Sequence, residues 1–293
     1  MDQGTIIRIG GPIVDASGLR EAQMYELVRV SDLRLMGEVI RINDDVATIQ
    51  VYEDTSGLKP GEPVYRTGEP LSLELGPGLL RSFYDGLQRP LMTIHNEHGI
   101  YLPRTANPPA IAEDRWGFTP TVKAGDTVEP GTIFGTVQET DLVEHRLTIR
   151  PGVRGEVVAI AAPGDYGIHD SIITIRTDGG EEIEQDMTQR WPVRQPRPVA
   201  KRRPIDRPLV TGMRVIDTFF PVGKGGAACV PGGFGTGKTM TQHSLAKWSD
   251  ADIIIYIGCG ERGNEMTDVL RSFPELEDPR SGKPLMDRTV LIA

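Results

Sequence analysis

Residues 232–239 read Gly-Gly-Phe-Gly-Thr-Gly-Lys-Thr and match the phosphate-binding loop pattern G-x-x-x-x-G-K-[ST] without a mismatch. A small, apolar run precedes this loop at 226–231, and a helix-compatible stretch follows it at 240–248. The order predicts a strand, a glycine-rich loop and a helix, with backbone N–H groups and the positive end of the helix dipole facing a phosphate. A chance match in a glycine-rich chain is the alternative, and the flanking segments argue against it.

The loop also predicts which side chains meet a bound nucleotide. Lys238 would reach the β- and γ-phosphates, and the Thr239 hydroxyl would bind Mg²⁺. We expect the nucleotide to contact the loop and the first helical residues, namely Gly232, Gly233, Phe234, Gly235, Thr236, Gly237, Lys238, Thr239 and Met240.

A second chemical motif follows the apolar run 252–258, which is typical of a strand buried in a parallel sheet. The next residues read Cys-Gly-Glu-Arg-Gly-Asn-Glu at 259–265. Ligands of doubly wound sheets bind at the carboxyl ends of the strands, so we expect Glu261 on the same edge as Lys238. A carboxylate there can orient or deprotonate an attacking water, and Arg262 could contact phosphate oxygens. The alternative is a structural Glu–Arg pair at a strand end.

Composition limits the class of protein. The chain has 293 residues, enough for two domains or three small ones, and a net charge of −9 that argues against a nucleic-acid partner. Its apolar runs are shorter than a membrane span, and Met1–Gly4 lacks the features of a secretion signal, so the cytoplasm is the expected location. We expect Cys229 and Cys259 to be small core residues.

The first third of the chain predicts a small barrel and then a change of character. Residues 1–68 alternate short β-rich runs with turns, including a hairpin formed by 39–42 and 46–52. In 69–110, the leucine-rich stretch 79–87 is compatible with a short helix that ends near a glycine.

The rest of the chain predicts an insertion and an α/β part. Residues 111–188 are β-rich, and the candidate hairpin tip at 141–145 has no lysine, which excludes a lipoyl or biotinyl carrier. The Pro- and Arg-rich segment 189–208 is interpreted as a stiff connector in preference to a nucleic-acid arm. Helix and strand signals alternate from 209, and 289–293 is a buried-strand pattern.

The chain as a whole resembles the catalytic A subunit of the V/A-type rotary ATPases. The β-rich stretch 111–188 resembles the insertion that distinguishes A subunits from secretion ATPases and from the F-type beta subunit. The other stretches that carry the resemblance are 4–6 with 10–12, 83–91, 99–104, 191–194, 211–221, the phosphate loop and 260–265.

The resemblance implies a division of roles among residues. Glu261 would be the catalytic carboxylate, with Lys238 and Arg262 beside the phosphates. The cofactor would be Mg²⁺ with ATP or ADP, and the phosphate and Mg²⁺ ligands would be Gly232, Gly235, Gly237, Lys238 and Thr239.

It also implies an assembly. A neighbouring B subunit, alternating with this chain in a hexamer, would supply an arginine finger, and central and peripheral stalk subunits would be further partners. The chain would then be cytoplasmic and peripheral on the cell membrane, which it would meet only through the complex.

The chain departs from the family pattern in two ways. The family usually has Pro where this chain has Gly233, and it continues well beyond residue 293. The Walker B aspartate and the adenine-side aromatic are therefore missing, and the apolar run that ends in Asp217 precedes the loop. We therefore expect a truncated A subunit, inactive as an isolated chain.

The expected fold is a multidomain β plus α/β protein. It comprises an N-terminal β-barrel at 1–68, the start of the nucleotide-binding domain at 69–110, a β-rich insertion at 111–188 and a partial RecA-like P-loop NTPase domain at 189–293. The expected function is the catalytic subunit of a rotary ATPase that couples ATP synthesis or hydrolysis to H⁺ or Na⁺ transport. Two alternatives stay open: a non-catalytic fragment that binds nucleotide weakly or not at all, and a secretion-type or F-type relative.

Overall fold

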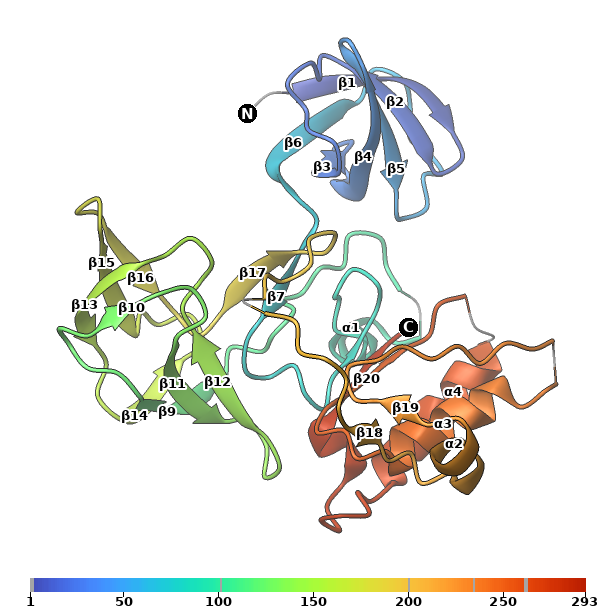
Figure 1. Ribbon diagram of the computed structural model, residues 1–293. Helices are drawn as coiled ribbons and strands as arrows, with labels where there is room; N and C mark the ends of the chain where they lie inside the picture. The colour runs from blue at the N-terminus through green and yellow to red at the C-terminus, as the bar shows by residue number, and fades with distance from the viewer. Residues whose placement is uncertain (1–2, 101, 200, 234, 261–262) are drawn as a thin grey trace. The chain divides into compact units, whose positions relative to one another are not determined.

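The computed structural model describes residues 3–100, 102–199, 201–233, 235–260 and 263–293 (Figure 1). The chain forms two compact units, and each is described by itself. Unit 1 comprises Met1–Leu75, Leu91–Pro109 and Arg190–Arg197, and unit 2 comprises Gly76–Pro90, Ala110–Gln189 and Pro198–Ala293. Within the described residues, no helix is both long and apolar enough to cross a lipid bilayer. The four domain bounds drawn from the sequence stay a prediction.

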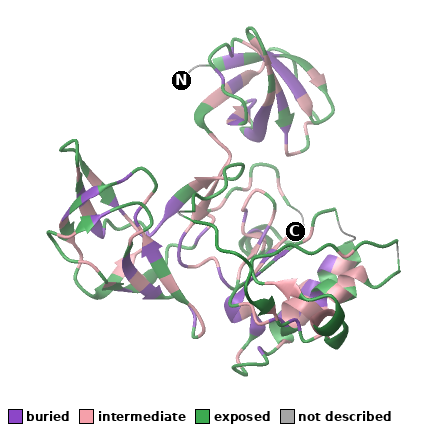
Figure 2. Ribbon diagram, in the orientation of Figure 1, coloured by how far each residue is buried: buried purple, intermediate pink, exposed green. Residues whose placement is uncertain are grey.

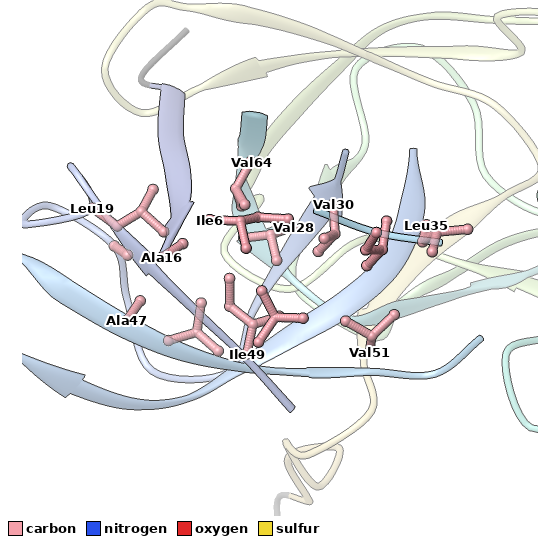
Figure 3. Packing of buried hydrophobic residues seen from close by; sticks show 14 residues of the cluster. Ile6, Ala16, Leu19, Val28, Val30, Leu35, Ala47, Ile49, Val51 and Val64 are labelled. Atoms are coloured by element: carbon pink, nitrogen blue, oxygen red, sulfur yellow. The ribbon is translucent and has the colours of Figure 1, made fainter. Parts of the chain in front are cut away.

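Unit 1 contains the predicted barrel. Six antiparallel strands close in the order β1-β2-β5-β4-β3-β6. Their bounds are β1 (Gln3–Gly10), β2 (Ile13–Ser17), β3 (Glu26–Val30), β4 (Leu35–Asn43), β5 (Val46–Val51) and β6 (Pro63–Pro70). Buried and more exposed residues alternate along β3 and β5, and Figure 2 colours the ribbon by this burial. Aliphatic residues such as Ile6, Val28 and Ile49 fill the interior (Figure 3). The expected hairpin is confirmed as β4 and β5, joined through Asp44 at φ 52°.

A buried carboxylate joins the later segment of unit 1 to its barrel. The Glu38 side chain is 1% exposed and accepts hydrogen bonds from Arg194 Nε at 3.0 Å and from the Tyr52 hydroxyl at 3.0 Å. Burial, together with the bond to Glu38, raises the pKa of Tyr52 to about 12. The guanidinium also lies 4.5 Å from the centroid of the Tyr25 ring. Arg194 is therefore bonded to the barrel, although 53% of its side chain stays exposed.

Two further elements complete unit 1. β7 (Ser72–Leu75) pairs with β17 (Gln189–Pro192), and the Val193 N–H donates to Leu71 O at 2.9 Å just beyond this pair. α1 (Leu91–His98) has Ile94 as its buried residue.

The insertion in unit 2 is a pair of four-stranded antiparallel sheets. One has the order β10-β13-β15-β16 and the other β12-β11-β9-β14. Phe118, Phe134 and Ile175 are among the buried residues that form the core of this part. The strands are β9 (Arg115–Pro120), β10 (Thr127–Val128), β11 (Ile133–Gln138), β12 (Glu144–Thr148), β13 (Gly155–Ile160), β14 (Gly164–Gly167), β15 (Ile173–Thr177) and β16 (Glu182–Gln185).

The remainder of unit 2 is the α/β part, built on three parallel strands. β8 (Phe83–Tyr84), β20 (Ile254–Ile257) and β21 (Thr289–Ile292) pair in the order β20-β21-β8, so segments far apart in sequence become neighbours. Ile254, Tyr256 and Leu291 from this sheet share a core with the helical residues. The other elements are β18 (Pro208–Leu209), α2 (Arg214–Phe219), β19 (Val222–Gly223), α3 (Lys238–Trp248), α4 (Gly263–Ser272), η1 (Phe273–Glu275) and η2 (Leu285–Arg288).

Three local expectations are wrong. No strand forms at 226–231, because its small side chains offer little to bury and Pro231 lacks an N–H. The stretch 79–87 is not a helix, because parallel pairing with β21 turns Phe83 and Tyr84 into β8. Cys229 and Cys259 are exposed and do not belong to a core.

A hairpin tip links the insertion to the α/β part. Glu139, between β11 and β12, accepts the N–H groups of Gly78 at 2.8 Å and Leu80 at 3.0 Å, and its other oxygen lies 2.9 Å from His145 Nδ1. The next residue, Thr140, donates its hydroxyl to Asp287 O at 2.8 Å. Burial alone would raise the pKa of Glu139, but the hydrogen bonds from His145, Leu80 and Gly78 outweigh it and hold that pKa below its usual value.

Replacing Glu139 by Gln should therefore destabilise unit 2 in a pH-dependent way. A depressed folded-state pKa stabilises the fold above the ordinary Glu pKa, and this stabilisation disappears as the pH falls through the depressed value. The difference in unfolding free energy between wild type and Glu139→Gln should be largest near about pH 7 and shrink towards about pH 3. Urea unfolding across this range measures it. Glu144→Gln, at an exposed site of the same hairpin, is the control, and a difference that stays constant with pH would contradict the assignment.

Candidate functional site

The phosphate loop enters α3 through two glycines in the left-handed region. Gly235 has φ +78°, and Gly237, the residue before α3, has φ +82°. A residue with a Cβ in this conformation costs about 1–2 kcal/mol. The two glycines therefore set the turn that directs the backbone into the first residues of the helix, Lys238 and Thr239.

The loop is closed by its own side chains. Lys238 Nζ donates to the carbonyl oxygen of Gly232 at 2.6 Å, and the Thr236 hydroxyl donates to that of Gly233 at 2.9 Å. The Lys238 ammonium is thus held over the loop, at the N-terminal end of α3. It adds a full positive charge to the partial positive charge of the helix dipole. This arrangement suits an anion with several oxygen acceptors.

A carboxylate from α4 faces the first turn of α3. The Thr239 hydroxyl donates to Glu265 Oε2 at 3.3 Å. α4 presents Met266 and Val269 to the core, whereas Glu265 and Asp268 line a cavity. The strand β20 ends close to this helix, since a Cβ on Gly258 would lie only 2.3 Å from the sulfur of Met266.

The cavity has a volume of about 740 Å³ and follows the loop and both helices. It is lined by Gly233, Gly235, Thr236, Gly237, Lys238, Thr239, Met240, Gln242, His243, Gly260, Glu265 and Asp268. Its donors and acceptors divide by charge: the ammonium and backbone N–H groups lie at the loop, and two carboxylates lie on α4.

The side-chain oxygens of Thr239 and Glu265 are suitable ligands for Mg²⁺, which prefers a few protein oxygens together with water and phosphate oxygens. Among the described residues, no group of three or more His, Cys, Asp or Glu side chains could hold a metal ion by itself. The chemistry of the site therefore suits a cation that arrives with a phosphate ligand.

The structure brings most of the predicted loop residues to one cavity. Gly233 and residues 235–240 line it, and Gly232 contributes the carbonyl that holds Lys238. Phe234, Glu261 and Arg262 lie outside the described residues, so their predicted roles stay predictions.

Sequence reasoning assigned no role to four residues that line the cavity: Gln242, His243, Glu265 and Asp268. Glu265 closes the 259–265 motif, and a carboxylate placed just after a predicted strand was a signal for it. Its contact with Thr239 depends on how α3 and α4 pack, which a local pattern does not give.

Models of the ATP synthase alpha/beta family match three parts of the chain. They are the beta-barrel domain at residues 6–68, the barrel-sandwich domain at 108–194 and the nucleotide-binding domain at 212–293. These matches agree with the barrel, the paired sheets and the α/β part, and they confirm the expected fold class.

Proteins with curated names are similar over almost the whole chain. The A subunit of the A-type ATP synthase from Methanopyrus kandleri is 57% identical over 99% of this chain and 49% of its own length, and that from Thermococcus sibiricus is 56% identical over 99% and 50%. The V-type ATP synthase alpha chain 1 of Clostridium tetani is 54% identical over 99% and 49%. The chain spans about half the length of the curated relatives it matches.

Gly237→Ala should loosen the start of α3. The strain of about 1–2 kcal/mol lowers the free energy of local opening, so hydrogen exchange of the Thr241 amide, which donates to Gly237 O at 2.9 Å, should accelerate about five- to thirtyfold. Gly233→Ala is the matched control, because a Cβ meets nothing within 4 Å at either position and Gly233 does not have a positive φ. Equal exchange in the two variants would contradict this account of the loop.

Proposed function

This chain belongs to the ATP synthase alpha/beta family, and we propose that it is part of the catalytic A subunit of a V/A-type rotary ATPase. In that role it would couple ATP synthesis or hydrolysis to the transport of H⁺ or Na⁺. The observation that carries the proposal is the Lys238 ammonium at the N-terminus of α3, inside a cavity that also contains the Thr239–Glu265 pair. We also propose the domain bounds 1–68, 69–110, 111–188 and 189–293.

We assign the binding of the nucleotide phosphates to the loop. Lys238 would exchange its bond to the Gly232 carbonyl for the β- and γ-phosphates, while the loop N–H groups and the helix dipole face the remaining charge. Thr239 and Glu265 would hold Mg²⁺, which when bound neutralises charge on the transferred phosphoryl group. The Thr239 hydroxyl would then release Glu265 and turn an oxygen lone pair towards the ion.

We assign the chemical step to Glu261 and Arg262. Glu261 would orient the attacking water and accept its proton during hydrolysis, and Arg262 would stabilise charge on the phosphate oxygens. In the sequence, both stand between Gly260, which lines the cavity, and Gly263, where α4 begins.

The assembly is part of the same proposal. A B subunit would supply an arginine finger at an alternating interface, and stalk subunits would connect the hexamer to an ion-conducting membrane sector. The chain would then be cytoplasmic and peripheral to the membrane. Support comes from the names of its relatives, which are components of ATP synthases.

Lys238→Ala should weaken nucleotide binding at least about tenfold, because a charge-assisted contact to phosphate contributes about 1.5–3 kcal/mol. Titration of the chain with a fluorescent ATP analogue measures the loss, and circular dichroism checks that the fold is kept. Lys247→Ala removes the same charge from the last turn of α3, away from the cavity, and should leave affinity unchanged. Equal affinity in wild type and Lys238→Ala would refute the proposed site.

Glu261→Gln should remove turnover and keep binding. General acid–base assistance contributes about 10²–10⁴-fold, so steady-state hydrolysis by the assembled complex should fall by that factor while analogue affinity stays within about twofold. Glu275→Gln makes the same chemical change at an exposed site outside the cavity and should have no effect. Hydrolysis near the wild-type rate in Glu261→Gln would make this residue structural.

A further inference from the structure

α3, the helix that starts at the phosphate loop, is held by few buried contacts. All its residues, Lys238–Trp248, are described, and His243 is the one that is buried. Ala246 packs partly against the core, whereas Met240 and Trp248 are 67% and 55% exposed. A helix usually fixes its position with an apolar stripe. Here a polar aromatic residue takes the central position.

His243 makes a hydrogen bond to the strand beneath it. Its Nε2 lies 3.2 Å from the hydroxyl of Tyr256, a buried residue of β20. The two rings meet edge to face, with centroids 5.5 Å apart. The bond is directional, so it fixes the rotation of α3 about its axis as well as its distance from the sheet.

The same imidazole also contacts the segment that continues α4. Its centroid lies 6.1 Å from that of Phe273 in η1, at an interplanar angle of 81°. Phe273 in turn lies 5.8 Å from Tyr256, so the three rings form one cluster. Each edge-to-face contact of this kind stabilises the fold beyond what the burial of the rings contributes. The cluster therefore joins α3, β20 and the end of α4.

This cluster lies directly behind the phosphate site. His243 is one turn beyond Thr239 on the same helix, and it lines the cavity that Lys238 and Glu265 also line. A shift or rotation of α3 would move Lys238 and lengthen the 3.3 Å contact between Thr239 and Glu265. The geometry of the binding groups thus depends on the anchor of one helix.

We propose that His243 is a positioning residue for nucleotide binding, which acts through its hydrogen bond to Tyr256 to hold the N-terminus of α3 against the phosphates. The inference rests on the proposed function of the loop and assigns the alignment of that loop to one residue pair. It requires no contact between His243 and the nucleotide. Because α3 meets the phosphate end of the ligand, the effect should depend on the number of phosphates.

The test compares variants that remove the bond and keep the rings. Tyr256→Phe, His243→Phe and the double variant lose the hydrogen bond, whereas His243→Gln offers an amide, which can donate or accept, in place of the imidazole nitrogen. Ser244→Ala is the control on the next helical residue, whose hydroxyl bonds within α3, to Met240 O at 2.9 Å. Lys238→Ala is run in parallel as the test of the site itself.

Affinities for ATP and AMP are measured by competition with a fluorescent ATP analogue, on samples whose fold is checked by circular dichroism.

Tyr256→Phe and His243→Phe should each weaken ATP binding about three- to tenfold, the range expected for one buried hydrogen bond, and should each change AMP binding by less than about twofold. The double variant should bind ATP no more weakly than the weaker single variant, because both single variants remove the same bond. His243→Gln should recover most of the ATP affinity.

Other results would overturn the inference. If Lys238→Ala weakens ATP binding while Tyr256→Phe and His243→Phe leave it unchanged, the pair is only part of the core and the proposed function stands alone. If the loss is equal for ATP and AMP, or if His243→Gln is as weak as His243→Phe, the bond does not position the phosphate end. If Lys238→Ala itself has no effect, the proposed function fails and the inference fails with it.

Discussion

The partial charge at a helix N-terminus acts over little more than one turn, so it helps an anion only if the helix is held in one position. In this protein α3 must satisfy that constraint with one buried side chain, His243, and with two left-handed glycines at its entry. The glycines set where the backbone starts the helix. The aromatic cluster sets how the helix lies on the sheet. The glycines and the cluster together determine the positions of Lys238 and Thr239 and the contact between Thr239 and Glu265.

The sheet beneath the site is assembled from distant parts of the sequence. β8 precedes the insertion, and β20 and β21 follow it, yet the three strands are parallel neighbours. Glu139 and Thr140 at the tip of the insertion hairpin bond to the segment before β8 and to η2 before β21. The insertion thus bonds to the segments that lead into two of the three strands.

The sequence predicts best what is local. The glycine spacing of the loop fixes backbone angles within a few residues, and short β-rich runs separated by turns identify the barrel. The helix predicted at 79–87 is wrong because Phe83 and Tyr84 form a strand with a partner about two hundred residues later in the sequence. The strand predicted at 226–231 is wrong for a related reason, since a strand forms only beside a neighbour that exchanges hydrogen bonds with it.

The site shows the same division. Lys238 and Thr239 are readable from one motif, and the cavity contains both. The roles of Glu265 and His243 cannot be predicted from a motif, because they depend on the packing of α4 and β20 against α3. Glu139 could be read as part of a hairpin but not as the acceptor of two N–H groups some sixty residues away.

The pairing of Glu38 with Arg194 has a consequence for synthesis on the ribosome. The two residues are 156 positions apart, and all six barrel strands emerge before Arg194 does. During that interval Glu38, on the outer face of β4, lacks the arginine that pairs with it in the folded chain. The first domain to be translated is in this sense among the last to be finished.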